Sequence, residues 1–126
     1  MTPDFTTGMV AEARRAFGRD ELAAYAALTG DGRAAGAVPE PLIGALFSHL
    51  LGTRLPGPGT NYLRQRLSFH AAALPGEELT ARVEVTRVRP DKALVNLATT
   101  CRGAGGRAIA TGEALVLVAD CVGAEG

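Results

Sequence analysis

The chain has 126 residues, of which 47% are hydrophobic and 21% are charged, so we expect one globular domain over residues 1–126 rather than a disordered chain. Its 13 Lys and Arg residues balance 13 Asp and Glu residues, which argues against nucleic-acid or membrane partners, and two cysteines are too few for a disulfide framework. No signal segment opens the chain and no apolar run could span a membrane, so we expect a cytoplasmic protein, and no residue spacing indicates a metal or a cofactor.

The N-terminal part is predicted to contain a strand and a helix. Residues 6–17 alternate loosely between apolar and polar side chains, which indicates a short strand. Residues 18–30 indicate a helix, because Gly18 can cap its start, acids fill its first turn and Gly30 can take the left-handed turn that ends a helix. One stripe of this helix is expected to face the core, and it contains four side chains: Leu22, Tyr25, Ala26 and Leu28.

A loop of Gly, Ala and Pro over residues 31–41 leads into a second predicted helix over residues 41–52. Pro41 suits the first turn of a helix, and Gly52 follows its last apolar residue. The apolar side chains surround most of this helix: Leu42, Ile43, Leu46, Phe47, Leu50 and Leu51. A helix that is apolar on nearly all sides is a buried helix, so we expect this one at the centre of the fold.

After a Gly/Pro loop over residues 52–60, apolar residues recur with a period of two, which indicates strands. Four such segments follow, with turns before the last two: 61–71, 78–90, 93–101 and 107–119. An antiparallel sheet wrapped around the second helix is the simplest way to bury that helix, and it gives an α+β fold. Such a sheet leaves open edges, which pairing with a second copy would cover.

Several stretches of the sequence resemble one known family. They are "LLGTRLPGPGTNYLRQRLSF" (50–69), "LPGEELTARVEVTRVRPDKALVNL" (74–97), "GEALVLV" (112–118) and "GRDELAAYAALTGD" (18–31). These stretches are similar to the MaoC-like (R)-specific enoyl-CoA hydratases and acyl-carrier dehydratases. The resemblance implies a hotdog fold, a homodimer or a heterodimer with another hotdog subunit, and an acyl-CoA or acyl-carrier-protein substrate that enters at the subunit interface.

The family's chemistry uses an Asp just after the first helix and a His five residues later, which activate water or take the proton in reverse. A His-Gly opens its central helix, where a backbone N–H holds the thioester carbonyl as charge develops on it. Asp31 stands at the position of the family's Asp, but Gly36 stands where the His would be. The loop that follows is shortened, and Pro39-Glu40 replaces the His-Gly.

Two acids are therefore the candidate catalytic residues. Asp31 is either the surviving half of the family's pair or a turn residue after a helix, for which Asp is a common choice. Glu40 is either a first-turn acid that favours the helix dipole or a replacement base that pairs with Asp31. Two carboxylates close together share a proton, which raises the pKa of one of them. An ionised Glu40 would, however, repel an oxyanion on the thioester.

Three further residues match positions that line the acyl pocket in the resembling enzymes: Ser48, Leu51 and Leu115. The same positions are equally suited to a plain core. His49 and His70 lie in a predicted helix and strand, where a single His is more often structural than catalytic. Neither matches the family's catalytic position.

Three functions remain open at this point. The first is an enzyme that retains hydro-lyase chemistry on an unsaturated or 3-hydroxy acyl thioester of fatty-acid or polyketide metabolism. The second is a non-catalytic subunit of a hotdog heterodimer. The third is a repurposed thioesterase or cyclase, for which the shortened loop would open the pocket to a bulkier substrate. The resemblance of the remaining pocket favours the first.

Overall fold

The structure, a computed structural model, describes residues 5–30 and 36–121. They form five strands and two helices, with one short 3₁₀ turn in each of the last two hairpins, η2 (Pro90–Lys92) and η3 (Ala104–Gly106). In chain order the elements are β1 (Val10–Arg15), α1 (Arg19–Thr29), α2 (Glu40–Thr53), β2 (Asn61–Phe69), β3 (Leu79–Arg89), β4 (Leu94–Arg102) and β5 (Ala108–Leu117). Each predicted helix and strand is present, with ends that differ by a few residues.

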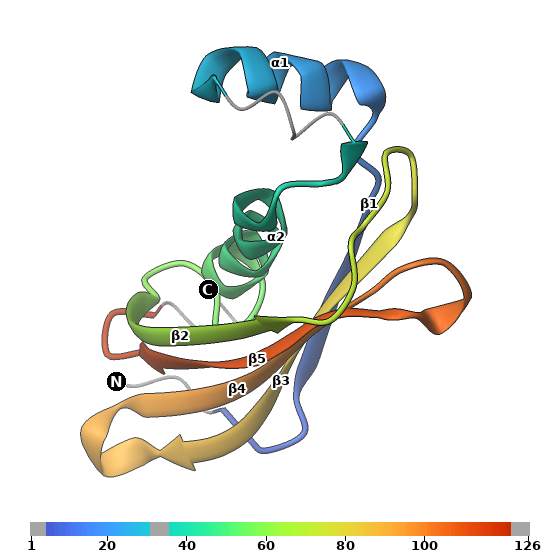
Figure 1. The fold of residues 1–126 in the computed structure, drawn as a ribbon. Helices are drawn as coiled ribbons and strands as arrows, with labels where there is room; N and C mark the ends of the chain where they lie inside the picture. Colours follow the sequence, from blue (N-terminus) through green and yellow to red (C-terminus); the bar gives the residue numbers. More distant parts are fainter. Residues whose placement is uncertain (1–4, 31–35, 122–126) are drawn as a thin grey trace.

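The strands form a single antiparallel sheet in the order β1-β3-β4-β5-β2, so β1 and β2 are its edges. Figure 1 shows α2 lying against one face of the twisted sheet, while α1 lies beyond the end of α2. Tight turns join β3 to β4 and β4 to β5, and Ala93 takes a left-handed conformation in the first of them. The predicted α+β architecture of a sheet wrapped around a central helix is confirmed.

The core lies between α2 and the face of the sheet that α2 covers. Four side chains of α2 are buried there: Ile43, Phe47, Leu50 and Leu51. They meet alternate residues of the inner strands, including Leu79, Ala81, Val83, Val85, Val95, Leu97, Ala114 and Val116. The other side of α2, with Ser48 and His49, is exposed. Within one chain α2 is therefore buried on the side that faces the sheet, and not on nearly all sides as its composition predicted.

Helix α1 begins and ends as its sequence predicts but buries a narrower stripe. Gly30 follows the helix with a φ of 77°, and its backbone N–H donates to the carbonyl of Ala26. Leu22 is fully buried, whereas the side chain of Leu28 is 86% exposed, so the expectation that Leu28 faces the core is wrong. A spacing of six residues places Leu28 about 120° around the helix from Leu22, at 3.6 residues per turn.

Candidate functional site

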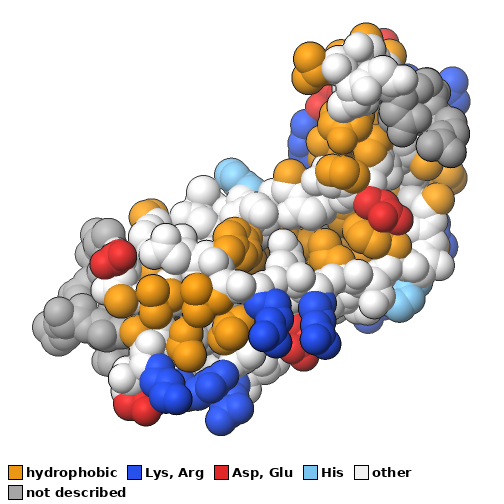
Figure 2. Space-filling model, turned by 60° about the vertical axis from the view of Figure 1, so that its left-hand side comes forward, with side chains coloured by type: hydrophobic (Ala, Val, Ile, Leu, Met, Phe, Trp, Pro, Cys, Tyr) orange, Lys and Arg blue, Asp and Glu red, His pale blue; other side chains and the backbone are white. Residues whose placement is uncertain are grey.

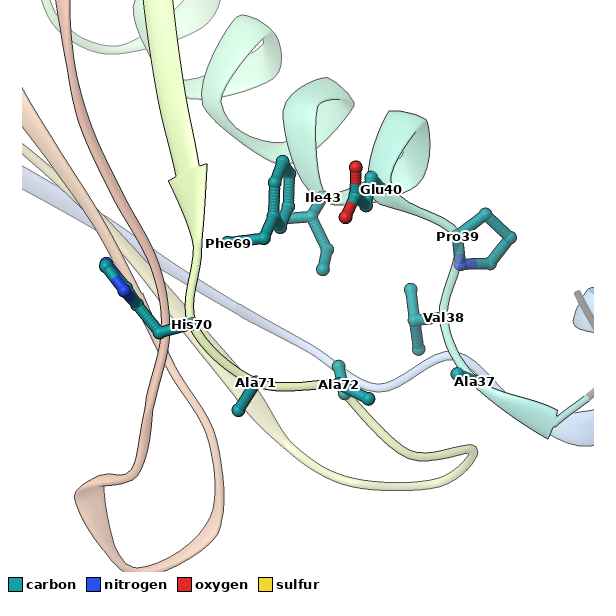
Figure 3. A pocket seen from close by; sticks show the side chains of 10 residues that line it. Ala37, Val38, Pro39, Glu40, Ile43, Phe69, His70, Ala71 and Ala72 are labelled. Carbon is teal, nitrogen blue, oxygen red and sulfur yellow. The ribbon is translucent and has the colours of Figure 1, made fainter.

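A cleft of about 580 Å³ lies at the N-terminal end of α2. Its walls are the segment before α2, the first turn of α2, the end of β2 and the segment after β2, as Figure 3 shows. The lining residues are Ala37, Val38, Pro39, Glu40, Ile43, Phe69, His70, Ala71, Ala72 and Ala73. A backbone hydrogen bond of 2.8 Å from Val38 N–H to the Ala73 carbonyl joins the two walls. The cleft is therefore built by segments that are distant in the sequence.

The interior of this cleft is mainly apolar. In Figure 3 the side chains of Ile43 and Phe69 lie close together, with the carboxylate of Glu40 beside them. Glu40 is the first residue of α2, where a negative charge is favoured by the helix dipole. Among the described lining residues, Glu40 is the single acid. The arrangement can hold an alkyl chain against Ile43 and Phe69, with one carboxylate and the start of a helix at its edge.

The ring of His70 is turned away from Glu40, although its backbone lines the same cleft (Figure 3). Its Nε2 lies 2.7 Å from the Oγ1 of Thr111 on β5. His49 lies on the exposed side of α2 and does not line the cleft. Within the described residues, the structure brings neither histidine to Glu40.

The predicted catalytic residue Asp31 lies outside the described residues, so its role stays a prediction. The described chain resumes at Gly36, the position where the family's His would be, and Gly36 is exposed. The next residue, Ala37, already lines the cleft.

Of the predicted acyl-pocket residues, Ser48 and Leu51 are three positions apart on α2, so they lie about 60° apart around the helix, but they differ in burial. Leu51 is fully buried against the sheet. Ser48 is exposed and hydrogen-bonds to the phenol of Tyr62. Burial raises the pKa of Tyr62, and the hydrogen bond with Ser48 opposes that shift. Sequence reasoning did not single out Tyr62, although it lies in a segment that carries the family resemblance.

Leu115 lies on the face of the sheet opposite to α2. Its neighbours Ala114 and Val116 are buried in the core, and side chains alternate along a strand, so Leu115 points the other way. It pairs with Asn96 on β4 and with Arg64 on β2. Within one chain, the structure therefore does not bring Leu115 together with Ser48 and Leu51. A shift of one residue along a strand is enough to exchange its two faces.

The remaining groups with shifted pKa values lie outside the cleft. Burial, with the nearby carboxylate of Glu77, raises the pKa of the Cys101 thiol to about 11, which makes its thiolate scarce. The Glu77 carboxylate accepts hydrogen bonds from Arg107 and from the backbone N–H groups of Leu74 and Ala104, and its pKa falls to about 2. These contacts tie the segment before β3 to the β4–β5 turn.

Two negative findings apply to residues 5–30 and 36–121. No group of three or more His, Cys, Asp or Glu side chains is placed to hold a metal ion. No helix there is both long and apolar enough to cross a membrane.

The chain is 42% identical to the (R)-specific enoyl-CoA hydratase of Aeromonas caviae, over 86% of this chain and 92% of that protein. It belongs to the (R)-specific enoyl-CoA hydratase family. It is also 46% identical to the (R)-specific enoyl-CoA hydratase of Rhodospirillum rubrum, over 61% of this chain and 53% of that relative. No protein-family model matches the chain.

Solved structures of two (R)-hydratases have the same fold as this family member. One, from A. caviae, is described as involved in PHA biosynthesis; it superimposes with a TM-score of 0.82 at 39% identity, over 90% of this chain and 97% of that one. The other is an R-hydratase from Pseudomonas aeruginosa in its unliganded form, with a TM-score of 0.80 at 31% identity, over 90% of this chain and 82% of that one. The hotdog fold is thus confirmed.

The alignment with the A. caviae hydratase also shows a difference in length. It spans 123 positions yet covers 86% of this 126-residue chain, so the hydratase carries residues that this family member lacks. The shortened loop predicted after Asp31 is one place for such a gap. The fold is shared, and no His occurs between residues 31 and 48 of this chain.

Proposed function

We propose that this protein binds an acyl thioester in the cleft at the start of α2 and catalyses its hydration or dehydration. The observation that carries the proposal is the apolar cleft bounded by the first turn of α2, with the carboxylate of Glu40 at its edge. The names of the relatives support the reaction class, since they are enoyl-CoA hydratases and a 3-hydroxybutyryl-CoA dehydratase. The acyl chain would lie against Ile43 and Phe69.

Hydration adds the oxygen of water to the third carbon of the enoyl chain and a proton to the second. As charge develops on the thioester oxygen, a backbone N–H at the helix start would stabilise it. Glu40 can supply that N–H, because Pro39 and Pro41 have none. The N–H of Leu42 is already engaged with the carbonyl of Pro39 at 3.0 Å.

Asp31 and Glu40 are the proposed acid and base. One carboxylate, ionised, would remove a proton from water, while the other, protonated, would deliver a proton to the second carbon. Fatty-acid or polyketide thioesters, carried by CoA or by a carrier protein, are the proposed substrates.

A non-catalytic subunit is the second candidate, and one observation favours it. Within the described residues no histidine ring enters the cleft, because His70 contacts Thr111 instead. Such a subunit would hold part of an acyl chain and leave the chemistry to a hotdog partner with a complete Asp and His pair. A repurposed thioesterase or cyclase stays a prediction from the shortened loop.

Pairing of two subunits is proposed on the basis of β2. This edge strand exposes both of its faces from Asn61 to Arg66, including the apolar side chains of Tyr62 and Leu63. A long, exposed edge strand is a template for pairing with another chain. A homodimer, or a heterodimer with another hotdog subunit, would cover it.

The test measures hydration of crotonyl-CoA and of a crotonyl carrier protein by the wild type and three variants. Asp31→Asn and Glu40→Gln keep side-chain shape but remove a proton carrier, so each should lower turnover on the order of a hundred- to ten-thousand-fold. Glu78→Gln, at an exposed position outside the cleft, is the matched control. Wild-type protein that binds butyryl-CoA but hydrates neither substrate would support the subunit function and refute the enzyme.

A further inference from the structure

A second, smaller pocket lies on the opposite face of the sheet from α2. It has a volume of about 170 Å³ and is lined by Arg64, Arg66, Arg89, Asn96, Glu113, Ala114 and Leu115. Arg64, Leu115 and Asn96 are direct cross-strand neighbours, so their side chains share a face. That face is not the one that α2 covers. Val95 and Leu97, which come directly before and after Asn96 in β4, are buried in the core, so Asn96 points to the other side. We call this pocket the basic pocket. It is separate from the cleft at the start of α2, which we call the acyl cleft.

Two polar atoms of the basic pocket are buried without a partner among the described residues. They are the Nε of Arg89 and the side-chain oxygen of Asn96. Buried polar atoms in native proteins nearly always have a hydrogen-bond partner, so each exception requires an explanation such as an ion or a ligand. Two exceptions in one small pocket point to a ligand with hydrogen-bonding groups.

The charges of the basic pocket identify the kind of ligand. Three guanidinium groups and the one carboxylate of Glu113 leave an excess of positive charge. Within the described residues none of these three arginines forms an ion pair, whereas Arg82 is bonded to Glu84 at 3.1 Å and Arg107 to Glu77 at 2.9 Å. Figure 2 shows Lys and Arg side chains gathered in two groups beside an apolar area. An anion would neutralise the excess charge.

We propose that the basic pocket binds a phosphate group. A guanidinium group presents several N–H donors in a planar fork that matches the oxygens of phosphate, and Arg89 would donate its buried Nε–H as well. The amide of Asn96 can turn so that its NH₂ group points to the same place, which adds a neutral donor. The negative charge of Glu113 repels an anion and therefore lowers the affinity of the basic pocket for phosphate.

The phosphate can come from CoA, which carries a diphosphate and a 3′-phosphate, or from another phosphorylated compound. Both sources share the chemistry that the three arginines recognise. The proposal does not depend on hydratase activity, because the basic pocket and the acyl cleft lie on different faces of the sheet. Binding can therefore be measured on protein that performs no catalysis.

The test is calorimetric titration of the full chain with inorganic phosphate, pyrophosphate, CoA and 3′-dephospho-CoA, at low and high salt. Wild-type protein should bind inorganic phosphate, and added salt should weaken that binding. Arg89→Gln and Arg64→Gln should each weaken it about ten-fold, the effect of one charged hydrogen bond. Glu113→Gln should strengthen it. Arg82→Gln is the matched control, because Arg82 is paired with Glu84 outside the basic pocket.

The four ligands separate the sources of the phosphate. Tighter binding of CoA than of 3′-dephospho-CoA, with the difference lost in Arg89→Gln, would support the proposal and identify the 3′-phosphate. Equal affinity for both, tighter than for inorganic phosphate and weakened in Arg89→Gln, would support the proposal and identify the diphosphate. Equal affinity for both that is no tighter than for inorganic phosphate, with phosphate binding that Arg89→Gln weakens, would support it with a source other than CoA. Wild-type protein that does not bind phosphate, or equal affinities in folded Arg89→Gln, Arg64→Gln and Arg82→Gln, would overturn it. Circular dichroism establishes that each variant is folded.

Discussion

The hairpins from β3 to β5 differ from the region where α2 begins in how closely the sequence follows the expected pattern. In the hairpins, alternate residues are buried and the turns fall where the sequence predicts them. At the start of α2, by contrast, the chain has Pro39-Glu40 where the resemblance predicts a His-Gly, and no His follows Asp31 before residue 48. The fold is shared with the A. caviae hydratase at 39–42% identity, whereas the proposed chemistry depends on a few residues near the start of α2. A scaffold fixed by many small contacts tolerates change in the few residues that would do chemistry.

The same contrast separates the two faces of the sheet. The face under α2 is packed with apolar side chains and carries stability. The other face has arginines, glutamates and polar residues that do not enter the core, so they can change with little cost to folding. The basic pocket lies on this second face.

The largest effect is expected from a substitution in the packed region. The side chain of Phe47 on α2 is fully buried against the sheet. Phe47→Ala should lower the free energy of unfolding by about 3–5 kcal/mol, because the smaller side chain leaves a cavity. Chemical denaturation measures the change. His49→Ala, on the exposed side of the same helix, should change it by less than about 0.5 kcal/mol. Equal effects of the two variants would mean that α2 does not pack as described.

A smaller effect is expected where β3 meets the β4–β5 turn. The pKa of Glu77 in the folded state is about 2, below its ordinary value of 4.5, because Arg107 and two backbone N–H groups bind its ionised form. Its contribution is therefore present above pH 4.5 and is lost as the pH falls towards 2. Glu77→Gln should lower stability at neutral pH by about 1.5–3 kcal/mol, the range for hydrogen bonds to charged groups.

Unfolding measured across pH tests this account of Glu77. The wild type should lose more stability than Glu77→Gln between pH 4.5 and 2, so the two curves should converge. Glu78→Gln, its exposed neighbour, should follow the wild type. Parallel curves for the wild type and Glu77→Gln would show that the carboxylate is not held in its charged form.

The smallest effect on stability is expected at a glycine in the sheet. A side chain at Gly112 would collide with the backbone carbonyl of Arg66 on the neighbouring strand β2. Gly112→Ala should therefore force β2 to shift and cost about 1–3 kcal/mol. Gly52→Ala, in α2 with open space around it, should instead raise stability by up to about 1 kcal/mol. If the described packing is correct, thermal unfolding should show a lower melting temperature for Gly112→Ala and a higher one for Gly52→Ala than for the wild type.

The sequence predicts the elements of the fold well, because segments with a period of two and glycines at turns and helix ends are strong local signals. It was less informative about which side of an element meets a partner. The sequence predicts Leu28 in the core, where it is not, and burial of α2 on nearly all sides, although Ser48 and His49 are exposed. Such errors arise because local apolar content does not say how many neighbours a helix has.

The candidate site was predicted only in part. Glu40 lines the cleft and begins α2, which fits both hypotheses about it, so its role stays a prediction, as does that of Asp31 outside the described residues. The basic pocket was missed, because Arg64, Arg89 and Asn96 come from three strands and meet only through the sheet register. The alternation of side chains along β2, β3 and β4 would have placed these residues on one face, had the strand order and register been known.

The central claim is that the cleft at the start of α2 receives the acyl chain, and filling that cleft tests it most directly. Ala72 is an exposed lining residue, so Ala72→Phe should occupy the cleft without disturbing the core. The affinity for butyryl-CoA should then fall by about ten-fold or more, whereas Ala24→Phe, at an exposed position on α1, should leave it unchanged. Unchanged affinity in folded Ala72→Phe protein would contradict the claim and place the acyl chain elsewhere.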